Sequence, residues 1–384
     1  MPCGKSILIL WIFYPISCTS NEAHFKRRYD LFHDELVDQL KALDTHQTKF
    51  NPNEFQVLEQ VRELSRKQAF LDHDKFDQLC QEHKIGEVEH SFTQEDFLGI
   101  LDKLGEIIHF PDLDWSEAYV LNPRWLTHGV YTLLYADKTN QQQGELSEAD
   151  VVEILHPQVI EDEQGNKLTY PKAKCRFIID AMSNFKLSYR LLEDNTRFII
   201  PDKLHSEQPD LTDYFDKNAE GTLTFEFDFQ GLLPRNIMPN LIVARHKEII
   251  KDKQGKALVW QHGVIIYNES CQATARLQVD YHQRILRLWI QGKEARDYLV
   301  ILRDEIYKIL DTIKGLVVTE NVILPDSARI NTQRLSLSAG EKDEKATYQS
   351  LIEQAKAGQE IVFSDAGNQY DLEKVIGFIT GQSH

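Results

Sequence analysis

Between residues 222 and 229, apolar and polar side chains alternate strictly along the chain, and the apolar ones are Leu223, Phe225, Phe227 and Phe229. This period of two predicts a β-strand with one face in a core. Further patterns follow, namely strands at 257–267, 273–279 and 285–290, a helix near 239–249 that begins at Pro239, and a long amphipathic helix at 293–313. Residues 216–320 are therefore expected to form an α+β unit, in which the long helix covers an antiparallel sheet.

The preceding segment, residues 46–215, is expected to be mainly helical. Apolar residues recur at three- and four-residue spacing, and this periodicity predicts helices near 55–64, 76–80, 93–104 and 147–155. Asn122-Pro123 predicts another helix start, because proline at the first helical position has no N–H to satisfy. Shorter strands are expected at 107–110, 187–192 and 197–200. Small helices followed by a hairpin predict a winged-helix-like subdomain.

The two ends of the chain carry patterns of their own. Residues 7–14 form a continuous apolar run, and residues 21–43 form an amphipathic helix, which together resemble the closing strand and helix of an α/β domain. The alternative is an export signal, because Lys5 precedes the run and small residues around Cys18 follow it. Residues 321–384 are expected to be a C-terminal extension, with a polar linker at 326–346 followed by a helix, a strand and a helix.

The charge and the cysteines limit the classes of partner. The formal net charge is −17, which disfavours binding to nucleic acids and to anionic membrane surfaces. The candidate recognition helix at 94–104 is itself acidic. Five cysteines are scattered without a CxxC pair, as expected for free thiols in the reducing cytoplasm. We therefore expect a cytoplasmic protein that binds neither nucleic acid nor membrane.

The sequence contains no complete catalytic motif. Gly4-Lys5-Ser6 matches the end of a phosphate-binding loop, but no strand or glycine-rich turn can precede it in three residues. The kinase, GxSxG and HExxH motifs do not occur, and the histidines lack metal-ligand spacing. We therefore expect no catalytic residues, no cofactor and no metal in this chain.

Several separated segments, in the same order, resemble the COR domain of Roco proteins, which follows a Ras-like Roc GTPase domain. The segments are 105–113, 120–126, 233–246, 260–263 and 284–292. The motif residues within them are Asn122, Pro123, Trp125, Leu126, Pro234, His246, Gly263 and Gly292.

This resemblance implies a division into four parts. Residues 1–45 would be a remnant of the last strand and helix of a Roc domain, followed by COR-A at 46–215, COR-B at 216–320 and the extension at 321–384. Ser17, Cys18 and Thr19 would be the remnant of the guanine-contacting loop, although Thr19 replaces the lysine that is usual in the family. The complete nucleotide site would lie upstream.

By the same resemblance, the chain would be a non-catalytic module that forms a homodimer through COR-B and couples to a Roc GTPase in cis or in trans. Trp260, Tyr281 and Trp289 are candidate anchors of the dimer interface, although aromatic residues of this kind are also common in cores. Two alternatives remain. The chain could be a fragment of a full-length Roco GTPase or serine/threonine-kinase-type protein, or an exported or lipid-anchored protein.

Overall fold

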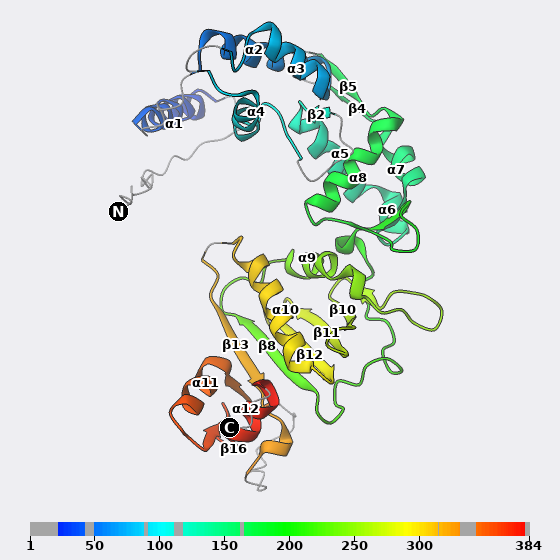
Figure 1. Ribbon diagram of the computed structural model, residues 1–384, viewed down its shortest axis with the longest axis vertical. Helices are drawn as coiled ribbons and strands as arrows, with labels where there is room; N and C mark the ends of the chain where they lie inside the picture. Colours follow the sequence, from blue (N-terminus) through cyan, green and yellow to red (C-terminus); the bar gives the residue numbers. More distant parts are fainter. Residues whose placement is uncertain are drawn as a thin grey trace.

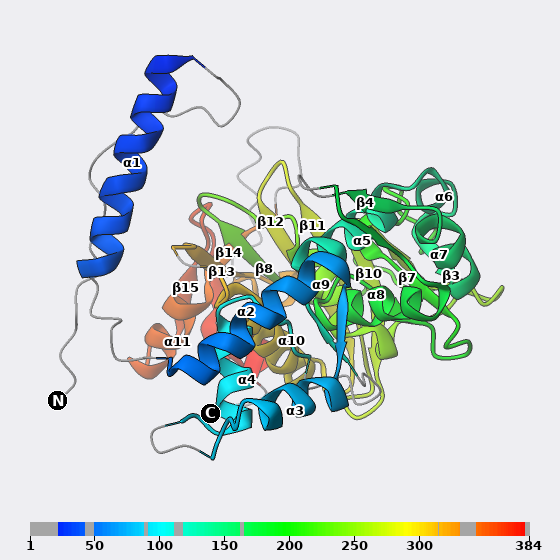
Figure 2. The ribbon, with the colours of Figure 1, turned by 90° about the horizontal axis from the view of Figure 1, so that it is seen from above.

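The computed structural model describes residues 22–42, 50–87, 91–110, 118–161, 165–313, 315–330 and 343–380. The fold is a mixed α+β structure with two lobes: a mainly helical first lobe, and a second lobe built on a large antiparallel sheet (Figure 1). Helix α1 (Ala23–Ala42) stands apart from both lobes in two perpendicular views (Figures 1 and 2). Among the described helices, none is both long enough and apolar enough to span a bilayer.

The first lobe begins with a small helical core. Its elements are α2 (Pro52–Lys67), β1 (Phe70–Asp72), α3 (His73–Glu82), α4 (Gln94–Lys103) and β2 (Ala118–Val120). Asn51 and Glu54 form a reciprocal capping box that fixes the start of α2. Strands β1 and β2 pair in antiparallel fashion and close this core against the next one.

A second core completes the first lobe. Its helices are α5 (Pro123–Tyr135), α6 (Asp137–Gln141), α7 (Glu148–Leu155) and α8 (Lys172–Asn184). Its strands are β3 (Glu145–Ser147), β4 (Val159–Glu161), β5 (Lys167–Thr169), β6 (Tyr189–Arg190) and β7 (Arg197–Ile199). The strands form a three-stranded sheet in the order β3-β7-β6 and a separate β4-β5 hairpin.

The second lobe is organised by a seven-stranded antiparallel sheet in the order β14-β13-β8-β12-β11-β10-β9. The strands are β8 (Leu223–Phe229), β9 (Val259–Trp260), β10 (Gly263–Asn268), β11 (Ala273–Asp280), β12 (Ile285–Gly292), β13 (Val318–Ile323) and β14 (Lys345–Thr347). Helices α9 (Ile237–Ala244), α10 (Ala295–Leu310), α11 (Tyr348–Lys356) and α12 (Leu372–Thr380) share one core with the apolar face of the sheet. A small hairpin of β15 (Ile361–Phe363) and β16 (Gln369–Asp371) joins α11 to α12.

The observed elements differ from the expected ones at four places. The boundary expected at 320 falls inside β13, and residues of α11 and α12 belong to the same core as β8. The expected linker at 326–346 includes the start of β14, which pairs with β13. Helix α8 was not expected at all. Of the expected strand at 107–110, the structure has a single bridge between Ile108 and Val120.

Candidate interaction surfaces

The first family motif fixes the start of α5. The Asn122 side chain accepts a hydrogen bond from the Trp125 N–H (3.0 Å) and donates one to the Ser65 carbonyl (3.1 Å). Pro123 occupies the first turn, and Leu126 is buried. The indole of Trp125 is also buried, where its N–H donates to the Thr169 carbonyl at 2.9 Å. These residues therefore join α5 to α2 and β5, and their role in the structure is packing and capping.

Trp260 and Gly263 form a second unit, at the β9–β10 turn. The Trp260 side chain is 1% exposed and lies in a small core with Ile265 and Trp289. A Cβ atom on Gly263 would lie 2.8 Å from Cε2 of Trp260 and 2.6 Å from the Leu277 carbonyl oxygen. Only glycine lets the strand pass this close to the indole. The structure therefore places Trp260 inside the monomer, where it presents no surface to a partner.

The other two candidate anchors, Trp289 and Tyr281, differ in how far they are buried. Trp289 is buried, with the guanidinium carbons of Arg276 and Arg287 at 4.9 and 5.6 Å from its ring centroid. Tyr281 is half-buried, and its hydroxyl donates to the Arg235 carbonyl at 2.9 Å. Burial raises the pKa of Tyr281 to about 12. The three aromatic residues therefore do not form one exposed patch.

Arg276 was not singled out in the sequence, although a lone arginine in an apolar strand is a recognisable signal. Its guanidinium is buried and donates to the amide oxygens of Gln208 (2.8 Å) and Gln278 (2.6 Å). Burial lowers the pKa of Arg276. This cation holds the 205–218 loop against the open face of the sheet.

The remaining motif residues hold the second lobe together and join it to the first. Pro234 is buried before α9, and its carbonyl accepts from the Ile237 N–H. The His246 ring stacks on Tyr189 of β6, with ring centroids 5.1 Å apart. Gly292 has φ +130°, and a Cβ there would lie 2.6 Å from the Cα of Ala273. His246 is thus the motif residue at the junction of the lobes.

Helices α1 and α10 are among those that carry exposed apolar side chains. On one face of α1, Tyr29 is 47% exposed and Phe25 and Leu36 are half-buried, while the exposed Leu31 lies on another side of the helix. On α10, the exposed apolar residues are Val300, Ile301 and Tyr307. Apolar stripes of this kind are typical of surfaces that pack against another element.

The described residues include no group of three or more side chains suited to holding a metal ion. The thiols of Cys80, Cys175 and Cys271 are free and buried. Burial raises the pKa of Cys80 to about 12, so this thiol stays protonated near neutrality. The predicted guanine-loop remnant, Ser17, Cys18 and Thr19, lies outside the described residues.

The fold is thus a helical lobe that shares a core with an antiparallel-sheet lobe, and its motif residues cap helices and pack in the interior. The family model of the C-terminal of Roc, COR-A domain, matches residues 52–204, and that of the COR-B domain matches residues 220–377. The chain therefore belongs to the COR-domain family of Roco proteins.

The chain is similar to the Roco2 RocCORdC protein of Methanosarcina barkeri, solved bound to GDP, with 26% identity and a TM-score of 0.37. The match covers 46% of this chain and 51% of the other, so it spans about half the length of that protein. No curated protein matched the chain.

Proposed function

We propose that this chain is a non-catalytic, cytoplasmic COR module that couples to a Roc-type GTPase domain and self-associates through its COR-B lobe. Membership of the COR family supports the assignment. The observation that carries it is the uncovered apolar stripe of α1. An amphipathic helix gains most of its stability from packing that stripe against another element.

The occupant proposed for this stripe is the body of a Roc-type GTPase domain, in the same polypeptide or in another. Tyr29 is exposed, and Phe25 and Leu36 on the same face are half-buried, so this face of α1 offers apolar area over several turns. By the family resemblance, α1 corresponds to the closing helix of such a domain. The partner would then be a Roc domain that lacks its own closing helix.

Calorimetric titration of the full chain with a GDP-loaded Roc-type domain, shortened by its last helix, tests this proposal. We expect binding, and we expect the double variant Phe25→Ser/Tyr29→Ser to weaken it about tenfold or more, because two apolar contacts are lost. Tyr131→Ser, on the exposed face of α5, is the control and should change the affinity less than about twofold. Absence of binding, or equal effects of the two variants, would contradict the coupling.

Self-association is proposed to use the outer face of α10 rather than Trp260 or Trp289, which lie in the monomer core. Val300 is 60% exposed, and Ile301 and Tyr307 are exposed beside it. Light scattering of the full chain at tens of micromolar should give a dimer, and Val300→Asp/Ile301→Asp should shift it to monomer. Val159→Asp, at an exposed apolar position of β4, is the matched control. A wild-type chain that stays monomeric would contradict self-association.

A further inference from the structure

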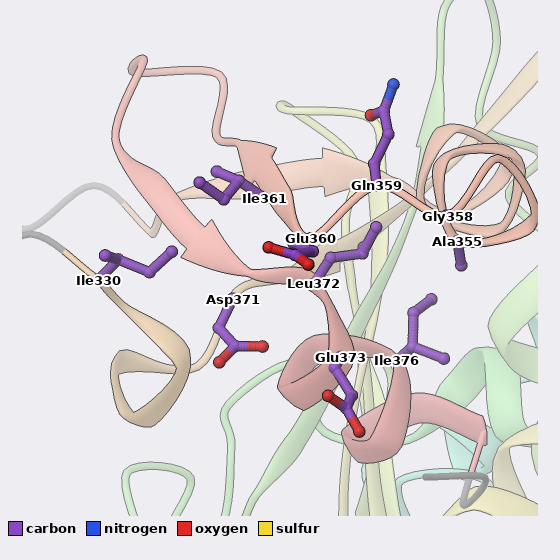
Figure 3. Close-up of a pocket in the computed structure, with 10 residues that line it drawn as sticks. All are labelled: Ile330, Ala355, Gly358, Gln359, Glu360, Ile361, Asp371, Leu372, Glu373 and Ile376. Atoms are coloured by element: carbon purple, nitrogen blue, oxygen red, sulfur yellow. The ribbon is translucent and has the colours of Figure 1, made fainter. Parts of the chain in front are cut away.

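A cleft of about 500 Å³ lies at the C-terminal end of the second lobe. It forms where the end of α11, the start of β15, the end of β16 and the first turn of α12 meet, with Ile330 on the far side (Figure 3). Leu372 and Ile376 are buried at its base, while Ile330 and Ile361 are exposed at its mouth. The cleft therefore has an apolar floor large enough for a long side chain.

The polar lining of this cleft is acidic. Three carboxylates line it, those of Glu360, Asp371 and Glu373, and its described lining includes no lysine or arginine. The Asp371 carboxylate lies 3.6 Å from the ammonium group of Lys374. Within the described part of the chain, Glu360 and Glu373 form no ion pair. An apolar floor with an acidic rim suits a lysine or arginine, whose aliphatic stem covers the floor while its cation reaches the rim.

Strand β15 adds an open edge next to the cleft. It pairs with β16 alone among the described strands. The N–H of Leu372 bonds the Glu360 carbonyl, and the N–H of Ser364 bonds the Asn368 carbonyl. By the alternation of an antiparallel ladder, the main-chain groups of Ile361 and Phe363 point away from β16. An edge strand with free N–H and C=O groups is a template for another strand.

The side chains along this edge are apolar. Ile361 is 40% exposed and Phe363 is 58% exposed, and both lie on the outward face of the hairpin. Natural edge strands commonly carry charges that discourage pairing, and β15 carries none within its three residues. The open edge and the acidic cleft are continuous, because Ile361 belongs to both.

We propose that this surface, which we call the β15 cleft, binds an extended basic segment of a partner protein by strand addition. The segment pairs with the main chain of Ile361 and Phe363 and packs an apolar side chain beside Phe363. It places a lysine or arginine over the apolar floor, among Glu360, Asp371 and Glu373. Main-chain pairing supplies affinity in this mode, and the cleft supplies the preference for a cation.

The test is fluorescence anisotropy with the full chain and a labelled peptide of alternating arginine and valine. We expect saturable binding, and we expect Glu360→Gln/Glu373→Gln to weaken it about tenfold. Glu207→Gln/Glu269→Gln removes the same charge from exposed positions away from the cleft, and should change the affinity less than about twofold. Equal weakening by the two double variants would reduce the binding to attraction by the net negative charge and would overturn the proposal.

A second probe separates strand pairing from charge. The same peptide, N-methylated at alternate residues on the edge that faces β15, keeps its charge but cannot complete the ladder. We expect it to bind about tenfold more weakly, and we expect the unmodified peptide to slow hydrogen exchange at Ile361 and Phe363. Equal binding of the two peptides, or exchange that is unchanged at β15, would overturn strand addition.

Discussion

Gly263 lies where strand β10 passes closest to the indole of Trp260, and this approach makes a testable prediction. Replacing Gly263 with alanine would place a methyl group 2.8 Å from Cε2 of Trp260 and 2.6 Å from the Leu277 carbonyl oxygen. The backbone carbonyl cannot easily move, so we expect a loss of about 2–3 kcal/mol in the free energy of unfolding. Urea unfolding followed by tryptophan fluorescence measures it.

Gly99 supplies the matched control for this substitution. It lies within α4, and a Cβ atom there would meet nothing within 4 Å. Gly99→Ala should therefore stabilise the protein by about 0.5–1 kcal/mol, because alanine has the higher helix propensity. If the two alanine variants behave alike, the close approach at Trp260 is not what requires glycine at Gly263.

Glu226 is a buried carboxylate held by two cations. It accepts from Arg287 at 2.6 Å and from Lys345 at 2.7 Å. Burial alone would raise its pKa, but the bonds from Lys345 and Arg287 outweigh burial and hold the pKa below the ordinary value of 4.5. We expect Glu226→Gln to lower the free energy of unfolding by about 2 kcal/mol near neutral pH, because Arg287 and Lys345 lose the negative charge that they share.

The pH dependence of this loss follows from the sign of the pKa shift. The pKa of Glu226 is lower in the folded protein than in the unfolded chain. Its contribution to stability is therefore complete above the pKa of the unfolded chain, and it disappears as the pH falls through the pKa of the folded protein. The difference between wild type and Glu226→Gln should therefore be constant above pH ~5 and shrink below pH ~4.5. Chemical unfolding at several pH values measures this difference. Glu59→Gln is the control, because it removes an exposed ion pair with Arg62, and it should change the stability by less than about 0.5 kcal/mol.

At the scale of elements, the N-cap of α5 is the joint between the two cores of the first lobe. Asn122 caps α5 through Trp125 and reaches across to the Ser65 carbonyl at the end of α2. Asn122→Ala removes both hydrogen bonds and should destabilise the protein by about 1–2 kcal/mol. Asn122→Asp keeps the oxygen that caps α5 and loses only the N–H donor to Ser65. Thermal unfolding should therefore show a smaller loss of stability for Asn122→Asp than for Asn122→Ala. Equal losses would mean that the cap contributes nothing.

Elements with a single clear periodicity could be predicted from the sequence. The alternation in 222–229 predicted β8, and the long apolar stripe in 293–313 predicted α10, to within a few residues. Helix α8 was not predicted because six consecutive residues, 177–182, are buried together with Cys175, and burial on all sides leaves no one-sided apolar stripe. Three-residue strands such as β1 and β3 are too short to show any period.

The candidate interface was less predictable than the elements. Trp260, Trp289 and Tyr281 have the composition of interface anchors, but composition does not distinguish an anchor from a core residue. Burial of Trp260 depends on the 205–218 loop, which reaches the sheet through Arg276 and Gln208, and no local pattern encodes that contact. The exposed stripe of α1, in contrast, could be read from the sequence as an amphipathic face.

At the scale of the whole molecule, the two lobes are joined by a common apolar core, because side chains of the first lobe pack inside the core of the second. Tyr189 and Ile199, from the β6–β7 hairpin of the first lobe, lie in the core that contains Phe225 and Leu241 of the second. Lys251 pairs with Glu193 at 2.6 Å across the same junction. Domains joined by a small polar contact usually move relative to one another. A shared apolar core instead predicts that both lobes unfold together.

Tyr189→Ala tests this coupling. The substituted residue belongs to the first lobe, but the cavity it leaves lies in the core of the second lobe. We expect a loss of about 3–4 kcal/mol, and hydrogen exchange should accelerate in both the β6–β7 hairpin and the α9–β10 region. Tyr189→Phe keeps the ring on His246 and should be nearly neutral, as should Tyr131→Ala on the exposed face of α5. Acceleration confined to β6–β7 would show two lobes that unfold independently. A signal from a GTPase bound at α1, as proposed, would then need another route to the COR-B sheet.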